Sequence, residues 1–210
     1  MARILSGPLS ERLGRTVIVE NRPGAGGMIG TEYVVHAKPD GSVILLAAPT
    51  EIVIAPSAYK TVRYDWTTDL APVTLAGTTP IVIVANPSIG VRTLSEMLAL
   101  AKQRPEGLAF GTPAEGSSHH LAGACLAQLS GARLVHVPYK SGLAAIQDVV
   151  SGQIPVSYSI LSSGASFIKA NKVRVLAQVN EKRSPSLPDI PSVAEIVPGF
   201  QQVPSWTAFF

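Results

Sequence analysis

Serine, histidine and glycine residues gather in one stretch, LAFGTPAEGSSHHLAG (108–123), and could bind or convert a small molecule there. The apolar run before Gly111 predicts a strand, and Ser117 or Ser118 predicts the N-cap of a following helix. A helix N-terminus presents unpaired N–H groups and about half a positive charge, so it suits an anion such as a carboxylate. Glu115 is an objection, because its own carboxylate either competes for these donors or points to solvent.

The same stretch predicts no catalytic serine and no metal site. The residues around Ser117 differ from the G-x-S-x-G pattern of a nucleophile elbow. His119 and His120 point about 100° apart on a helix and so do not chelate one metal together. His36 and His136 have no ligand spacing to either of them. We interpret these histidines as packing or capping residues, and we expect no cofactor and no metal.

A second glycine loop, in VIVENRPGAGGMIG (17–30), raises the question of a nucleotide-phosphate site. The dinucleotide fingerprint places its glycines directly after a strand and an acidic residue at the end of the next strand. Here residues 20–23 intervene, the next apolar run ends at Thr50 without an acid, and no G-K-[ST] occurs. We therefore exclude nucleotides. The glycines permit positive φ, either for a tight turn or for close approach to a ligand.

Composition indicates a folded protein of one large domain or two small ones. The chain has 210 residues, of which 46% are hydrophobic and 15% are charged. Its net charge of +3 is too small to argue for nucleic acid. Cys125 is the single cysteine, which excludes an intramolecular disulfide, and we expect it to be a small buried hydrophobe. No apolar run is long enough to span a bilayer, and the first residues do not read as a signal peptide.

Strand and helix patterns alternate along the chain. Strands are expected at 16–20, 42–49, 73–77, 80–86, 108–112, 133–139, 153–160 and 173–180. Helices are expected from the start of the chain to Gly14 and at 30–37, 93–104, 117–131, 142–152 and 165–171. Thr93 and Glu96 predict a capping box, and Pro105 ends that helix. Helices between non-alternating apolar strands predict an α/β fold with parallel sheets covered on both faces.

Five motifs then occur in order along the chain: ENRPGAGGMIG, KPDGSVILLAAP, the GS-x-x-HL of EGSSHHLAG, HVPYKSG and KRSPSLPDIPSVAE. Together they closely resemble the Bug-type extracytoplasmic solute receptors of tripartite tricarboxylate transporters. The resemblance implies a two-lobed type II periplasmic-binding-protein-like fold, with mainly parallel sheets flanked by helices and the ligand between the lobes. Lobe one would comprise 1–85 with 204–210, and lobe two 86–203.

The resemblance also implies a function and a set of site residues. Such receptors are periplasmic monomers that bind a small organic acid or dicarboxylate without chemistry and pass it to membrane permease subunits. The expected ligand-binding residues are Ala48, Pro49, Thr50, Thr112, Pro113, Gly116, Ser117, Ser118, Tyr139 and Ser159, with Gly24, Ala25, Gly26 and Gly27 shaping the cleft. The alternative interpretation is that Tyr139 is a half-buried packing residue and that Lys140 is solvated.

Ser159 stands where family members often carry an aspartate, which could pair with a ligand amino group. Its serine hydroxyl favours a plain organic acid over an amino acid.

Compared with the family, the chain begins inside the first helix and continues for only four residues after Trp206. We therefore expect an incomplete lobe one, without its first strand, first cleft loop and closing helix, and a more stable lobe two. If the start of the chain is genuine, the absence of an export signal implies a cytoplasmic location. The alternatives are then a ligand-sensing module or inactive fragment, or an enzyme on the same scaffold. The loops show no acid–base pair, so we expect no enzyme.

Overall fold

The computed structural model describes residues 1–202 and 204–210 and divides into two compact units. Unit 1 comprises Met1–Ala76 with Thr207–Phe210, and unit 2 comprises Gly77–Trp206. The sequence predicts the first division after residue 85 instead. The difference is residues 77–85, which include strand β3 (Ile81–Ala85); both ladder partners of β3 lie in unit 2, so hydrogen bonding assigns it there.

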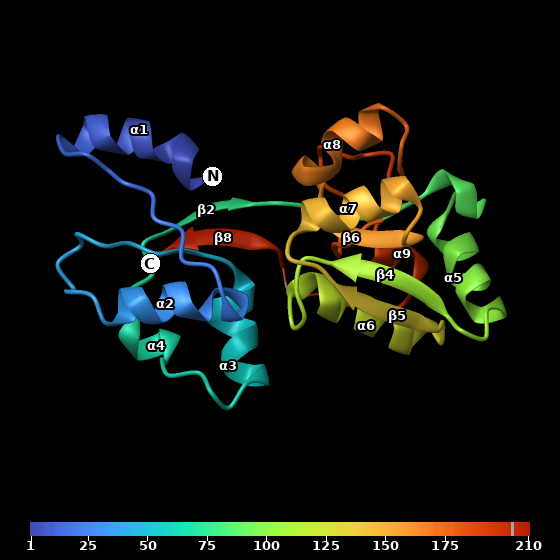
Figure 1. Cartoon of the computed structure of the whole chain (residues 1–210), viewed down its shortest axis with the longest axis horizontal. Helices are drawn as coiled ribbons and strands as arrows, with labels where there is room; N and C mark the ends of the chain where they lie inside the picture. Colours follow the sequence, from blue (N-terminus) through green and yellow to red (C-terminus); the bar gives the residue numbers. More distant parts are fainter. Residues whose placement is uncertain (203) are drawn as a thin grey trace. The chain divides into compact units, whose positions relative to one another are not determined.

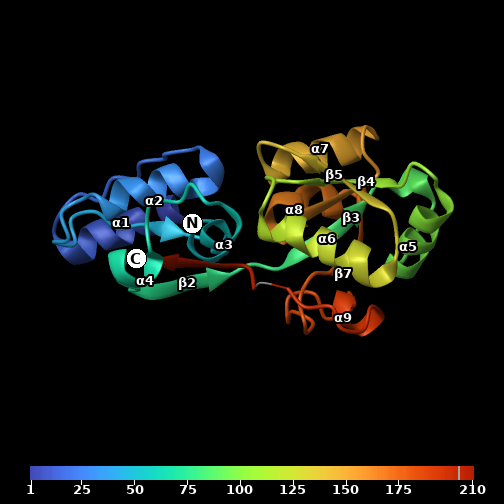
Figure 2. The ribbon, with the colours of Figure 1, turned by 90° about the horizontal axis from the view of Figure 1, so that it is seen from below.

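Unit 2 is built on a five-stranded sheet of order β5-β4-β6-β3-β7. Figure 1 labels β4, β5 and β6, and Figure 2 also labels β3 and β7. Strands β5 (Leu134–Pro138), β4 (Leu108–Thr112) and β6 (Val156–Ile160) are parallel neighbours. Strand β3 runs antiparallel to both β6 and β7 (Arg174–Gln178), so it alone in this sheet opposes the common direction. This confirms the expected mainly parallel sheet; the direction of β3 could not be read from the sequence, because a strand buried on both faces shows the same apolar run in either direction.

Helices cover both faces of this sheet, as Figure 2 shows from a second side. Helices α5 (Leu94–Gln103), α6 (Ser118–Ser130) and α9 (Val193–Ile196) pack with one apolar cluster, and α7 (Gly142–Ser151) and α8 (Leu161–Lys169) with another. Strand β3 divides its side chains between the clusters: Ile81 and Ile83 join the first, and Val82 and Val84 the second. This two-sided burial confirms the expected α/β layering.

Helix α5 starts and ends close to the predicted residues. Thr93 caps it by accepting the Glu96 N–H at 3.2 Å. The predicted capping box is wrong in its second half, because the Glu96 carboxylate accepts the N–H of Arg92 at 2.6 Å instead of that of Thr93. The Glu96 side chain thus bonds to the residue before the N-cap, and it still gives an exposed backbone N–H a partner.

Unit 1 has shorter elements around a three-stranded sheet of order β1-β8-β2. Its helices are α1 (Ala2–Leu13), closed by Gly14 at φ 63°, α2 (Met28–Val35), α3 (Ala55–Ala58) and α4 (Trp66–Asp69). Two single turns, η1 (Ala25–Gly27) and the π-helical η2 (Thr50–Ile54), precede α2 and α3. The strands are β1 (Leu46–Ala47), β2 (Thr74–Thr78) and β8 (Trp206–Phe209), with β1 and β8 antiparallel.

Two strand predictions in unit 1 are wrong or too long. Residues 16–20 form no strand, and the side chain of Ile18 is 83% exposed. The strand expected at 42–49 shrinks to Leu46–Ala47. A β-branched run becomes a strand only when a neighbour pairs with its backbone and covers its side chains. The sheet of unit 1 offers no such neighbour to residues 16–20.

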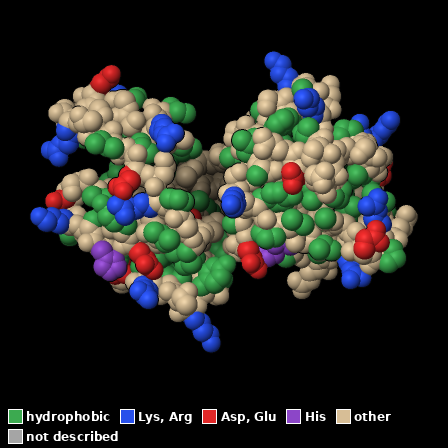
Figure 3. All heavy atoms as spheres, viewed as in Figure 1, with side chains coloured by type: hydrophobic (Ala, Val, Ile, Leu, Met, Phe, Trp, Pro, Cys, Tyr) green, Lys and Arg blue, Asp and Glu red, His purple; other side chains and the backbone are tan. Residues whose placement is uncertain are grey.

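The apolar core is concentrated in unit 2, since both buried apolar clusters consist of its residues. Large apolar residues are more exposed in unit 1, where Ile4 reaches 77% and Val73 66%, than in unit 2, where the most exposed described one is Leu143 at 48%. On the face shown in Figure 3, Lys and Arg side chains are interspersed with Asp and Glu. Among the described residues, no helix combines the length and the apolarity needed to cross a bilayer.

Candidate anion site at the start of α6

Three helices of unit 2 begin at one edge of its sheet. Strands β4, β5 and β6 are parallel neighbours, so their carboxyl ends lie at the same edge, where α6, α7 and α8 begin. The register aligns Thr112 with Pro138 and Gly111 with Ser157. Since helix N-termini carry partial positive charge, this edge favours an anion.

The loop from Thr112 to Ser118 is held by its own hydroxyl groups. The carbonyl of Ala114 accepts a hydrogen bond from Thr112 Oγ1 at 3.0 Å and another from Ser117 Oγ at 2.7 Å. Gly116 adopts φ 69°, a left-handed conformation that glycine adopts without strain. Thr112 is fully buried, and Ser117 and Ser118 nearly so. The loop is therefore fixed before any ligand arrives.

Ser117 caps α6, as the sequence predicted. Its Oγ accepts the N–H of His120 at 3.3 Å, and its carbonyl accepts the N–H of Leu121 at 2.9 Å. No described residue accepts a hydrogen bond from the N–H of Ser118 or His119. These two amides are the first-turn donors that a helix leaves without a partner. Glu115 is exposed, and no described loop amide donates to its carboxylate.

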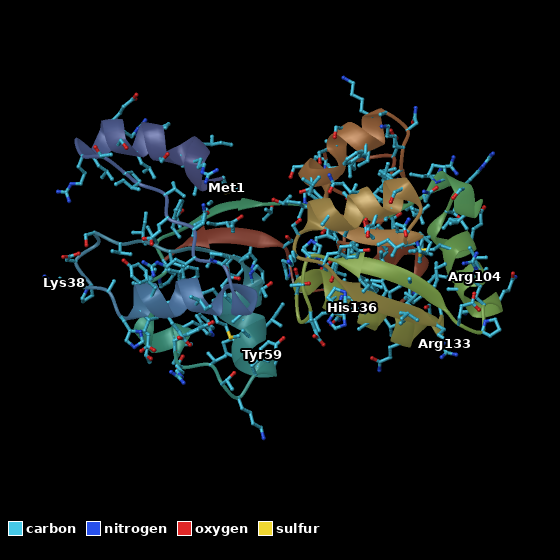
Figure 4. All side chains as sticks on the ribbon, in the orientation of Figure 1. Met1, Lys38, Tyr59, Arg104, Arg133 and His136 are labelled. Atoms are coloured by element: carbon cyan, nitrogen blue, oxygen red, sulfur yellow. The ribbon has the colours of Figure 1, made fainter. Side chains whose placement is uncertain are left out.

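The histidines of this region pack against the loop. His120 Nδ1 accepts the N–H of Gly116 at 3.1 Å, and the His120 ring stacks on that of His136, which Figure 4 labels on β5. Burial lowers the pKa of His119 to about 4. Within residues 1–202 and 204–210, no three His, Cys, Asp or Glu side chains are grouped to hold a metal ion.

Tyr139 and Ser159 lie at the same sheet edge but are engaged within unit 2. Tyr139 donates its N–H to Thr112 O at 2.9 Å and its hydroxyl to Asp148 Oδ2 at 2.8 Å. Burial and the Asp148 carboxylate raise the pKa of Tyr139 to about 12. Ser159 is fully buried inside β6, not after it, with its hydroxyl 3.4 Å from Ser157 Oγ. Lys140 is exposed.

The glycine loop of unit 1 forms a run of positive φ angles. Gly24, Ala25, Gly26 and Gly27 have φ of 130°, 47°, 64° and 99°. A Cβ on Gly27 would lie 3.0 Å from Cδ of Glu51, and one on Gly26 would lie 3.7 Å from Cγ2 of Thr50. The glycines therefore let this backbone turn and let it approach η2. No strand precedes the loop, so the expectation that it follows a strand end is wrong.

A side-chain carboxylate occupies the start of η2. Glu51 Oε1 accepts the N–H of Ala48 at 2.8 Å, and burial raises the pKa of Glu51 against the opposing effect of backbone N–H groups. Pro49, which lies between Ala48 and Glu51 along the chain, is buried. The structure thus brings Gly26, Gly27, Ala48 and Thr50 together around Glu51, which the sequence analysis had not singled out.

The predicted residues thus form two groups, one in each unit. In unit 2, Thr112, Gly116, Ser117 and Ser118 share one hydrogen-bonded loop, and Tyr139 pairs with its first residue. Two partners were missed: Asp148, which holds the Tyr139 hydroxyl, and Glu51. Asp148 lies nine residues beyond Tyr139, on a helix face, so only the structure reveals the pairing.

Comparison with known proteins identifies relatives along the whole chain. The chain is 37% identical to a protein encoded in the tcbD-tcbE intergenic region of Pseudomonas sp. (strain P51), covering 100% of this chain and 62% of that protein. It is 33% identical to Protein BugT of Bordetella pertussis, covering 93% of this chain and 60% of BugT. The chain therefore spans about three fifths of the length of these curated relatives.

Solved structures agree with this relationship. Rpa4515 of R. palustris, determined with adipate, has a TM-score of 0.88 and 30% identity over 99% of this chain and 70% of its own. MatC from Rhodopseudomonas palustris, with bound malate, has a TM-score of 0.87 and 26% identity over 100% and 71%. The periplasmic binding protein BugD has a TM-score of 0.87 and 32% identity over 99% and 69%.

These matches confirm the expected two-lobed binding-protein fold, and coverage of about 70% of each solved chain fits an incomplete lobe. The profile of the tripartite tricarboxylate transporter family receptor matches residues 1–210. The chain belongs to the tripartite tricarboxylate transporter receptor family.

Proposed function

We propose that this chain binds a small organic carboxylate at the start of α6 and, as part of a periplasmic receptor, passes it to membrane permease subunits. The observation that carries the proposal is the pair of unpartnered N–H groups of Ser118 and His119 at the carboxyl edge of the unit 2 sheet. Hydrogen bonds to a charged acceptor are about twice as strong as neutral ones. A carboxylate oxygen would accept from both amides, with the helix dipole adding to the attraction.

The ligand class follows from the relatives and from Ser159. Rpa4515 was determined with adipate and MatC with malate, both dicarboxylates. Ser159 carries no charge and is fully buried, so it offers nothing that would pair with a ligand ammonium group. We therefore favour a plain mono- or dicarboxylic acid over an amino acid.

An enzyme on this scaffold is disfavoured by the geometry of the serines and histidines. Ser118 Oγ lies 3.5 Å from His119 Nδ1, beyond the reach expected of an activated nucleophile and its base. Ser117 Oγ is engaged with Ala114 and His120. Neither serine has both a base and an acidic group to orient that base among the described residues.

Calorimetric titration with adipate, malate and glutamate tests the proposal, with the neutral diamide adipamide as the matched control. We expect heat of binding for at least one dicarboxylate, weaker binding of glutamate, and none for adipamide. Equal binding of adipate and adipamide would show that the site does not recognise the carboxylate charge. Turnover of any of these acids would instead favour the enzyme alternative.

A further inference from the structure

Two stacked imidazole rings lie directly behind the proposed anion loop. The rings of His120, on α6, and His136, on β5, have centroids 3.7 Å apart and planes inclined by 13°. His136 also contacts the ring of Phe110, with centroids 5.3 Å apart. Since Phe110 belongs to the apolar core of unit 2, the pair connects that core to the loop.

Each ring is tied to one end of the loop. His120 Nδ1 accepts the N–H of Gly116 at 3.1 Å, just before α6. His136 Nε2 lies 2.7 Å from Thr112 Oγ1, at the end of β4. Thr112 Oγ1 also lies 3.0 Å from Ala114 O, so His136 and the loop carbonyl together hold the Thr112 hydroxyl.

This arrangement requires a neutral His120. Its Nδ1 accepts a hydrogen bond only while it carries no proton, and protonation would set an N–H against the N–H of Gly116. The ionisable groups next to His120 are His119 on the same helix, His136 on β5 and Glu115 in the loop. Burial and the proximity of His120 lower the pKa of His136, and Glu115 opposes this.

We propose that His120 and His136 are positioning residues that hold Gly116 and Thr112 so that the Ser118 and His119 amides face the ligand. This rests on the proposed function, because it assigns positioning residues to that same site.

Two substitutions of His120 separate the acceptor from the aromatic ring. His120→Asn keeps an acceptor close to the position of Nδ1 but removes the aromatic ring. His120→Phe keeps the stack but removes the acceptor. His36→Asn in unit 1, where His36 Nδ1 contacts only the Glu32 carbonyl, is the matched control. Thermal melts of all variants establish that they are folded.

Adipate affinity is measured for each folded variant at pH 8. His120→Phe should bind about fivefold more weakly than wild type, as for one lost hydrogen bond. His120→Asn and His36→Asn should bind close to wild type, because the first keeps the acceptor for Gly116 and the second lies outside the loop. An unchanged affinity of His120→Phe, or an equal loss in His120→Asn and His120→Phe, would overturn the proposal.

A ligand-free measurement keeps this inference distinct from the proposed function. If no acid binds the wild type, the proposed function fails, yet nitrogen-15 NMR of the free protein still tests the positioning contact. We expect the Gly116 amide to exchange slowly with solvent in wild type and in His120→Asn, and faster in His120→Phe. Equal exchange of the Gly116 amide in all three proteins would overturn the inference.

Discussion

Replacing Ser117 by aspartate separates the two roles that the structure gives to the start of α6, capping the helix and receiving an anion. Ser117 Oγ accepts the His120 N–H at 3.3 Å and donates to Ala114 O at 2.7 Å. Aspartate caps helices as well as serine does, so the first contact is kept. The donation to Ala114 is lost, which costs about 1 kcal/mol and is partly offset by the helix dipole.

The same substitution should abolish most of the anion binding. Ser117 is only 4% exposed, so water screens a charge there poorly. Two like charges about 4 Å apart repel by about 4 kcal/mol at an effective dielectric constant of about 20. Even half of this repulsion weakens adipate binding by about 30-fold. Ser117→Ala, which leaves the Ser118 and His119 amides in place, should weaken binding by no more than about threefold.

The assay compares calorimetric affinity for adipate with urea unfolding for each variant. Thr93→Asp is the matched control, because Thr93 caps α5 at the opposite edge of the sheet and the change in net charge is the same. We expect Ser117→Asp to remain folded without urea while losing adipate, with a lower unfolding free energy because its carboxylate is buried. Retained affinity in folded Ser117→Asp, or an equal loss in Thr93→Asp, would refute the reasoning.

Three further predictions concern stability. Gln178→Leu should lower the free energy of unfolding by about 3 kcal/mol in urea titrations, because the fully buried Gln178 amide bonds to Ser184, Leu187 and Ile190; a loss below about 1 kcal/mol would contradict this. Burial holds the pKa of His119 near 4, so below about pH 6.5 the unfolded chain takes up a proton that the folded chain refuses. The free energy of unfolding should therefore decrease as the pH is lowered, by up to about 3 kcal/mol at pH 4. His119→Gln should lose this pH dependence; the same pH dependence in wild type and His119→Gln would exclude His119 as its source. Limited proteolysis should cut unit 1 before unit 2, since both buried apolar clusters lie in unit 2; equal resistance would contradict it.

Much of unit 2 could be predicted because its local signals agree with its packing. The apolar runs at 108–112 and 173–180 gave β4 and β7 to within a few residues, and Ser117 marked the start of α6. Cap chemistry and buried runs are local properties, which a sequence carries directly. The direction of β3 was missed because burial on both faces erases any sign of strand direction.

Unit 1 was predicted less well because its strands depend on neighbours. Residues 16–20 have strand propensity, yet nothing pairs with them, and Ile18 is exposed. The GAGG glycines were correctly expected to adopt positive φ, but their contact with Glu51 depends on the position of η2. The His120–His136 stack was likewise beyond the sequence, because the pairing of β4 with β5 sets it.

Amide NMR during an adipate titration locates the bound acid residue by residue. We expect the Ser118 and His119 amides to show the largest shifts and the strongest protection from exchange, with Gly116 following. The alternative location in unit 2 is a surface hollow of about 230 Å³ lined by Pro87, Ile168 and Arg174, at the opposite edge of the sheet. Saturable shifts centred on that hollow or in unit 1, with Ser118 and His119 unmoved, would contradict the proposed anion site.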